Sequence, residues 1–135
     1  MLVNLGRAHP IETLEQCVDG NQVPELARRV WEVHVDETVR DYIVRIVHET
    51  RHRDELLLGA SPRGSHALYR GSQAYAALHG RDFVLPDDVK QLAIAVLGHR
   101  CIVHPESALR GSRIEKIIED ILEKTSLDIG ELESL

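Results

Sequence analysis

Apolar side chains recur along this chain three or four residues apart, which is the spacing of one face of a helix. The clearest stripe follows Asp36, a residue type that often caps helix N-termini. That stripe predicts a helix whose apolar face consists of Val39, Tyr42, Ile43, Ile46 and Val47. A shorter helix is expected just before it, over residues 23–31, with Pro24 in the first turn.

Two further helices are predicted in the middle of the chain. The first opens at Ser61 and runs to about His79, where Gly80 can adopt the left-handed conformation that ends many helices. Its small residues indicate close packing against a neighbouring backbone; they are Ala67, Gly71, Ala74 and Ala77. The second begins at Pro86, and its apolar stripe consists of Val89, Leu92, Ala93, Val96 and Leu97.

The last predicted helix follows a capping box formed by Ser112 and Glu115. Its stripe comprises Ile114, Ile117, Ile118, Ile121 and Leu122. Two short β-prone pieces, residues 82–84 and 101–103, could pair as a minimal ribbon. The sequence therefore predicts a mainly α fold, a compact domain of about five helices with at most a short two-stranded β ribbon.

Composition narrows the classes of protein to which this chain could belong. Its 135 residues suffice for one domain with its own core. Acidic residues outnumber basic ones, for a formal charge of −6, and we interpret the surplus as a solvated surface. Because phosphate binding needs a net basic face, we expect no nucleic-acid partner.

Localisation is predicted from the cysteines and from the absence of long apolar runs. Cys17 and Cys101 lie far apart and outside any C-x-x-C pair, so two free thiols in a reducing cytoplasm are expected. No apolar run reaches the roughly 18 residues of a membrane span, and the first residues do not resemble a signal peptide. We expect a cytoplasmic protein without a membrane partner.

The segment HETRH, residues 48–52, matches the H-E-x-x-H pattern of zinc peptidases. Helical geometry, however, places His48 and His52 opposite the apolar stripe, where they would face water. Arg51 and Arg53 flank the pair, and their positive charges oppose metal binding. We therefore expect a polar helix face and no metal ligands.

The segment LGASPRGS, residues 58–65, contains a local conflict. Arg63 falls in the first turn of the helix capped by Ser61, although that end of a helix already carries partial positive charge. The conflict disappears if an anion binds there, held by backbone N–H groups and by the guanidinium group. The alternative is a surface arginine that merely tolerates its position.

These residues also carry a family resemblance. LLLGASPRGS, the small-residue helix and GRDFVLPDDVKQLAIAVLGHR resemble the C-terminal helical lid of MoxR-family AAA+ ATPases. RRVWEVHVDETVRDYIVRIVHETR is similar to the segment that enters that lid. The resemblance implies an entry segment from the ATPase large domain over residues 1–22, a lid domain over 23–127 and a tail over 128–135. Gly64 and Gly71 depart from it, since alanine is common there in the family.

The resemblance implies that Arg63 is the sensor 2 residue, which contacts the γ-phosphate of ATP and is the catalytic residue of this chain. Ser61, Pro62 and Arg63 would form the cofactor-binding motif, with ATP and Mg²⁺ as cofactors of the full-length protein. The family forms homo-oligomeric rings, usually hexamers. These rings act as chaperones, often with von Willebrand factor A domain proteins as partners.

The sequence contains no G-x-x-x-x-G-K-[ST] motif and no apolar strand ending in Asp-Glu. We therefore expect the chain alone to be inactive and to bind ATP only weakly. A second hypothesis is a free-standing helical adaptor that binds a partner protein through an apolar groove. The roles of His99 and Arg100 stay open between complementing a helix dipole and contacting a neighbouring subunit.

Overall fold

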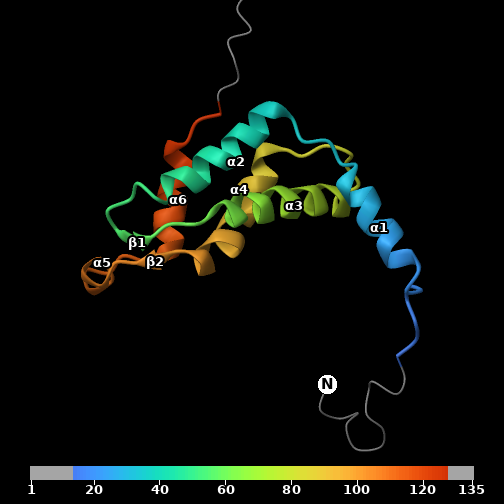
Figure 1. Cartoon of the computed structure of the whole chain (residues 1–135), viewed down its shortest axis with the longest axis horizontal. Helices are drawn as coiled ribbons and strands as arrows, with labels where there is room; N and C mark the ends of the chain where they lie inside the picture. The colour runs from blue at the N-terminus through green and yellow to red at the C-terminus, as the bar shows by residue number, and fades with distance from the viewer. Residues whose placement is uncertain (1–13, 128–135) are drawn as a thin grey trace, which may run out of the picture.

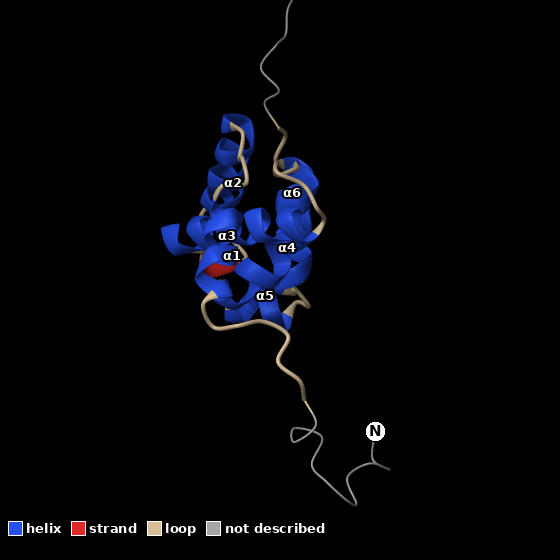
Figure 2. Ribbon diagram, turned by 90° about the vertical axis from the view of Figure 1, so that its right-hand side faces the viewer, coloured by secondary structure: helices blue, strands red, loops and turns tan. Residues whose placement is uncertain are grey.

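The computed structural model describes residues 14–127 (Figure 1). Within them are six α-helices: α1 (Gln22–Trp31), α2 (Glu37–Glu49), α3 (Pro62–Leu78), α4 (Pro86–Leu97), α5 (Pro105–Leu109) and α6 (Ile114–Lys124). A 3-10 turn, η3 (Gly98–Arg100), follows α4, and strands β1 (Leu56–Leu58) and β2 (Ile102–Val103) pair antiparallel. The predicted mainly α class is confirmed, and Figure 2 shows how little of the described chain is strand.

Helix α3 lies at the centre of the arrangement. Figure 1 shows α2 running alongside it, α1 near its C-terminal end, and the β1–β2 ribbon with α5 toward its other end. Helix α6 packs against α2 and α4. The shared core includes the whole predicted stripe of α2, together with Leu68, Val89, Ala93, Leu97, Ile118 and Ile121. No helix between residues 14 and 127 is long and apolar enough to span a bilayer.

Several helix ends agree with the sequence predictions. The Asp36 carboxylate accepts a hydrogen bond from the Thr38 backbone N–H at 2.9 Å, which caps α2. Gly80 follows α3 with φ +70°, the left-handed conformation expected there. Helix α1 begins at Gln22, one residue before the predicted start. The first 13 residues of the entry segment and the tail 128–135 lie outside the described residues.

Two predictions about the C-terminal third were wrong. The N-cap position of α6 is Arg113, and no side chain makes a capping bond there, so the proposed Ser112–Glu115 box does not form. Helix α5 was not predicted, because five residues are too few to show an apolar stripe.

The prediction named the wrong partner for the strand at residues 101–103. Residues 101–103 do contribute a strand, but it pairs with β1, with Leu56 opposite Val103 and Leu58 opposite Ile102. Residues 82–84 instead exchange backbone hydrogen bonds with His34, which donates to Asp82 O and accepts from Val84 N. β-propensity identified extended pieces, but the packing of α3 and α4 decides which of them meet.

The buried face of α3 is also offset from the prediction. Ala67, Gly71, Ala74 and Ala77 are only partly buried. The fully buried positions are Gly64, Leu68, Ser72, Gln73 and Ala76. This face includes a polar residue that the small-residue pattern did not indicate: the Gln73 amide donates hydrogen bonds to the carbonyls of Trp31 and Val33, at 3.2 and 2.7 Å.

Candidate functional site

The chain reaches the N-terminus of α3 by crossing the end of α2 very closely. A Cβ atom added to Gly59 would lie 2.5 Å from the Thr50 carbonyl oxygen and 2.8 Å from the Arg51 Cα. Since both neighbours are backbone atoms, neither can move aside cheaply. Only glycine therefore allows β1 to lead into α3 along this path.

Ala60, the next residue, is held by hydrogen bonds on both sides. Its N–H donates to the Thr50 hydroxyl at 2.9 Å, and its carbonyl accepts from the Arg51 guanidinium at 2.8 Å. The Thr50 hydroxyl in turn donates to Val47 O at 2.6 Å. Both Ala60 and Thr50 are fully buried, so the start of α3 is fixed to the end of α2.

The first residues of α3 are polar, exposed and incompletely bonded. Ser61 occupies the N-cap position, as predicted, but its hydroxyl makes no capping bond. Pro62 carries no N–H, and the first turn contains no acidic residue. The exposed Arg63 guanidinium makes no hydrogen bond or ion pair with residues 14–127. The structure thus places Ser61, Pro62 and Arg63 at an open, positively charged helix end.

The C-terminal end of α4 packs beside this site. A Cβ atom on Gly64 would lie 3.1 Å from Leu97 Cδ2 and 3.2 Å from the Ala60 Cβ, with Arg100 Cδ at 3.9 Å. An alanine at position 64 would therefore require its neighbours to shift by a few tenths of an ångström. Gly64 therefore allows α3 to pack more closely against Leu97 and Ala60 than an alanine would.

The side chains of His99 and Arg100 bond to the last carbonyls of α4. The His99 Nδ1 atom lies 3.1 Å from Ala95 O, and the Arg100 guanidinium donates to Val96 O. These contacts are those expected of basic residues that complement the C-terminal end of a helix.

Cys101 follows the same turn and lies against the buried Ala60 and Thr50. Burial raises the pKa of the Cys101 thiol, and hydrogen bonds with Ala60 and Thr50 offset this only in part. The thiol is therefore protonated at neutral pH and is not an activated nucleophile. Cys17 is exposed, and both cysteines are free.

The H-E-x-x-H segment begins in the last turn of α2, which ends at Glu49, and continues beyond it, so only His48 and Glu49 belong to the predicted polar helix face. His48 and His52 are exposed, and their ring centroids are 4.2 Å apart. The Nδ1 atom of His52 lies 3.0 Å from the His48 carbonyl. No group of three or more potential metal ligands occurs in the described part of the chain.

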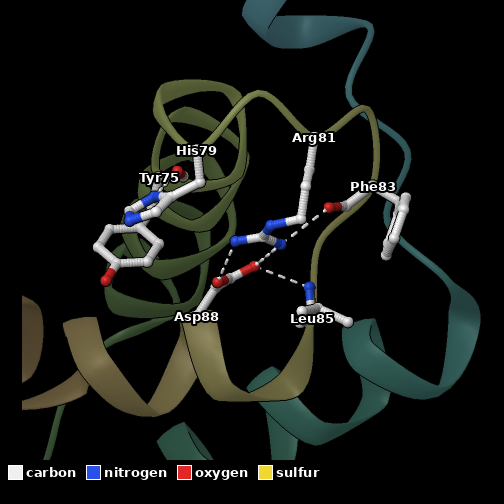
Figure 3. Close-up of polar contacts among 6 residues, drawn as sticks. All are labelled: Tyr75, His79, Arg81, Phe83, Leu85 and Asp88. Atoms are coloured by element: carbon white, nitrogen blue, oxygen red, sulfur yellow. Dashed lines mark hydrogen bonds and ion pairs between the residues drawn. The ribbon is translucent and has the colours of Figure 1, made fainter.

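A second arginine site, which the sequence did not reveal, lies just beyond the C-terminal end of α3. Figure 3 shows the Arg81 guanidinium facing the Asp88 carboxylate, with two hydrogen bonds of 2.7 Å. Arg81 also donates to Phe83 O at 3.3 Å, and Asp88 accepts from Leu85 N at 2.8 Å. The Asp88 side chain is 5% exposed and that of Arg81 is 22% exposed.

Charge stabilisation at Asp88 follows from this geometry. Burial of the carboxyl group raises its pKa, but the hydrogen bonds from Arg81 and Leu85 outweigh burial, and the pKa of Asp88 lies below its ordinary value. The carboxylate is therefore ionised at neutral pH and closes the turn between α3 and α4. We assign this pair to the structure of the fold and not to ligand binding.

Comparison with known proteins identifies the class of this fold. Residues 48–121 match the family described as AAA lid domain. The chain is 42% identical over 123 residues to the uncharacterized protein YeaC of Bacillus subtilis, covering 91% of this chain and 38% of that protein. It is 30% identical to the chaperone MoxR1 of Mycobacterium tuberculosis, covering 69% of this chain and 27% of that protein.

A solved structure agrees. The crystal structure of a "putative ATPase" from Cytophaga hutchinsonii superposes with a TM-score of 0.85 and 31% identity, over 93% of this chain and 40% of that one. The chain thus spans about two fifths or less of each of these proteins. It belongs to the AAA lid domain family, as the lid of a MoxR-type AAA+ ATPase.

Proposed function

We propose that this lid works within a longer AAA+ ATPase as its nucleotide-sensing module, with Arg63 as the sensor 2 residue. The observation that carries this proposal is the Arg63 guanidinium, exposed and without a partner among residues 14–127, at a helix end that lacks acidic residues. Such a group is suited to the terminal phosphate of ATP bound in an adjacent domain.

The residues around Arg63 fit a phosphate group. The Ser61 hydroxyl makes no bond to its own helix and is available to a ligand, and Pro62 fixes the backbone at the first helical position. The Ala60 N–H donates to Thr50 and the Ala60 carbonyl accepts from Arg51, which holds this end in place, so Arg63 would meet the phosphate with little reorganisation. ATP and Mg²⁺ are therefore proposed as cofactors of the longer protein.

The wider role follows from the family. We propose a homo-oligomeric ring, usually a hexamer in this family, in which lid movement on ATP binding and hydrolysis drives chaperone-like remodelling of client proteins in the cytoplasm. The relative named chaperone MoxR1 supports this role. Von Willebrand factor A domain proteins are the proposed partners.

The isolated chain should neither hydrolyse ATP nor bind it tightly. One charge-assisted hydrogen bond contributes about 1.5–3 kcal/mol, whereas micromolar binding requires about 8 kcal/mol. Magnesium-dependent turnover by rigorously purified chain would contradict the proposal.

The decisive experiment is Arg63→Ala in an ATPase that joins this lid to its nucleotide-binding domain. Turnover should fall by roughly tenfold to a thousandfold, because a cation aimed at developing phosphate charge is lost. ATP should lose part of its binding advantage over ADP, and Arg63→Lys should restore activity only in part. Arg28→Ala, at an exposed position on α1, is the matched control and should leave turnover unchanged.

The adaptor hypothesis has one observation in its favour. A groove of about 690 Å³ lies between α1 and α3, and Leu26, Val30 and Leu78 supply much of its apolar lining. This hypothesis does not need Arg63 to meet a nucleotide. Unchanged turnover and an unchanged ATP preference in the Arg63→Ala variant would therefore favour the adaptor.

A further inference from the structure

A polar groove of about 450 Å³ runs beside α6, and Arg63 is not among its lining residues. We call it the α6 groove. It is lined by five basic side chains, those of Arg53, Arg110, Arg113, Lys116 and Lys124, and by two acidic ones, Glu55 and Asp120. Five positive and two negative charges give a local balance of +3, on a chain whose formal charge is −6.

The basic side chains divide into two sets. At one end of the groove Asp120 accepts hydrogen bonds from Arg53 and from Lys124, the latter at 2.9 Å. The bonds from Lys124 and Arg53 hold the pKa of Asp120 below its ordinary value, so its carboxylate is ionised and offsets part of the positive charge at this end. At the other end Arg110, Arg113 and Lys116 are exposed, and their side chains make no hydrogen bond or ion pair with residues 14–127.

Arg113 and Lys116 lie at the N-terminus of α6, and Arg110 lies at the end of α5 on the same groove. A helix N-terminus carries partial positive charge, so Arg113 and Lys116 are in an unfavourable place, and Glu115 is the one acidic residue that α6 has in this turn. No side chain caps this end. An anionic partner would remove both penalties at once, and local conflicts of this kind are often found at functional sites.

We propose that the α6 groove docks an acidic, extended segment of a partner protein. Its shape favours a peptide over a compact anion, because Arg113 and Lys124 are eleven residues apart along α6, or about 16 Å. That length matches about five residues of extended chain. No aromatic side chain lines the groove, so it lacks the stacking surface on which proteins usually hold nucleobases.

The division of charge also sets the orientation of the bound segment. Carboxylates pair with Arg110, Arg113 and Lys116, and the two arginines can each make paired hydrogen bonds to a carboxylate. At the other end the ionised Asp120 is bonded to Arg53 and Lys124, so less positive charge is available there to a carboxylate. The acidic residues of the partner therefore lie over the first half of α6.

The test uses the whole 135-residue chain and a fluorescein-labelled octapeptide of alternating glutamate and glycine. Replacing Arg110, Arg113 and Lys116 together by glutamine should weaken binding at least tenfold. The matched control, Arg28→Gln, Arg29→Gln and Arg40→Gln, changes the net charge equally on exposed helix positions and should change affinity less than twofold. Amide NMR signals of Gly111 and Ser112 should shift on titration, and thermal unfolding of each variant checks its folding.

Several outcomes would overturn the proposal. Equal weakening in the two triple variants would mean general charge attraction, and absence of binding at millimolar peptide would remove the site. Stronger competition by inorganic phosphate, or by a ten-residue oligothymidylate, would identify a simple anion site or a nucleic-acid site instead.

The chain's own acidic tail is the remaining competitor, since residues 128–135 carry three carboxylates, Asp128, Glu131 and Glu133. Removing the tail should not change peptide affinity. Tighter binding after its removal, seen only when the three cations are present, would make the tail the occupant and refute a partner segment. None of these results depends on Arg63.

Discussion

Helix α3 has an arginine at each end, and the two are in opposite states. Arg81, beyond the C-terminal end, belongs to a closed network with Phe83, Leu85 and Asp88, in which its guanidinium makes three hydrogen bonds (Figure 3). Arg63, in the first turn, is exposed and bonds to nothing in the described chain. The same side chain thus stabilises the fold at one end and remains available to a ligand at the other.

The difference follows from the hydrogen-bonding groups that surround each arginine. The turn between α3 and α4 offers a buried carboxylate and a carbonyl, which together accept three hydrogen bonds from the Arg81 guanidinium. The N-terminus of α3 offers only N–H groups and an unbonded hydroxyl, which cannot neutralise a cation. The contrast predicts that substitutions at the closed end affect stability, whereas those at the open end affect ligand binding.

The largest expected effect is that of Asp88→Ala. The substitution leaves the Arg81 guanidinium and the Leu85 N–H without their acceptor, so the free energy of unfolding should fall by about 3 kcal/mol. Urea denaturation monitored by circular dichroism measures it. Asp87→Ala is the control, since Asp87 is 82% exposed and pairs only with Lys90. It should cost less than about 1 kcal/mol, and equal losses would show that the Arg81 network is not stabilising.

The next largest effect concerns the path that positions the open end. Gly59→Ala should lower the free energy of unfolding by about 2–3 kcal/mol, because the new Cβ atom meets the Thr50 backbone at 2.5 Å. Gly20→Ala, where no atom lies within 4 Å, should change stability by less than about 0.5 kcal/mol. Thermal unfolding of each variant measures these changes. An unchanged melting temperature for Gly59→Ala would mean that the backbone at position 59 does not pass this close to Thr50.

The pH dependence of stability should distinguish the closed network from the rest of the chain. The folded-state pKa of Asp88 is lowered, so its stabilising contribution is fully present above the unfolded pKa of about 3.9. That contribution is lost as the pH falls below this value and through the folded-state pKa. Urea denaturation at a series of pH values should show a smaller acid-induced loss for Asp88→Asn than for the parent. Parallel curves would argue against a role for Asp88 ionisation.

The smallest expected effect on stability is that of Arg63→Ala in this chain. The exposed guanidinium loses no hydrogen bond or ion pair with residues 14–127, so the free energy of unfolding should change by less than about 0.5 kcal/mol. Arg81→Ala, measured beside it, should cost several times more. A loss above about 1 kcal/mol for Arg63→Ala would reveal a structural role and weaken its assignment as a ligand-binding residue.

Local signals in the sequence were sufficient to predict most helix ends and the exposed position of Arg63 in the first turn of its helix. Asp36 and Gly80 act within their own turns, so residue type alone indicated their roles. The open position of Arg63 could likewise be predicted, because it depends only on the first turn of one helix.

What the sequence did not reveal depends on contacts between segments. Asp88 was predicted only as a first-turn acidic residue, since its pairing with Arg81 requires the path of the whole intervening turn. The ribbon was assigned to residues 82–84 because Phe83 and Val84 favour strands more than the leucines of β1 do. In the folded chain, however, tertiary packing brings residues 102 and 103 beside β1, with which they pair.

The close seating of α3 also has a mechanical consequence. This helix has 17 residues and is therefore a stiff rod of about 25 Å, with Arg63 at one tip. Gly64 rests against Leu97, and the Gln73 amide is bonded to the last residue of α1, so the rod is joined to a neighbour on either side of its middle. A tilt of about 5° moves one tip by about 2 Å relative to the other. If nucleotide binding tilts α3, the bond from Gln73 to Trp31 would carry that tilt to α1, which contacts α3 near its C-terminal end.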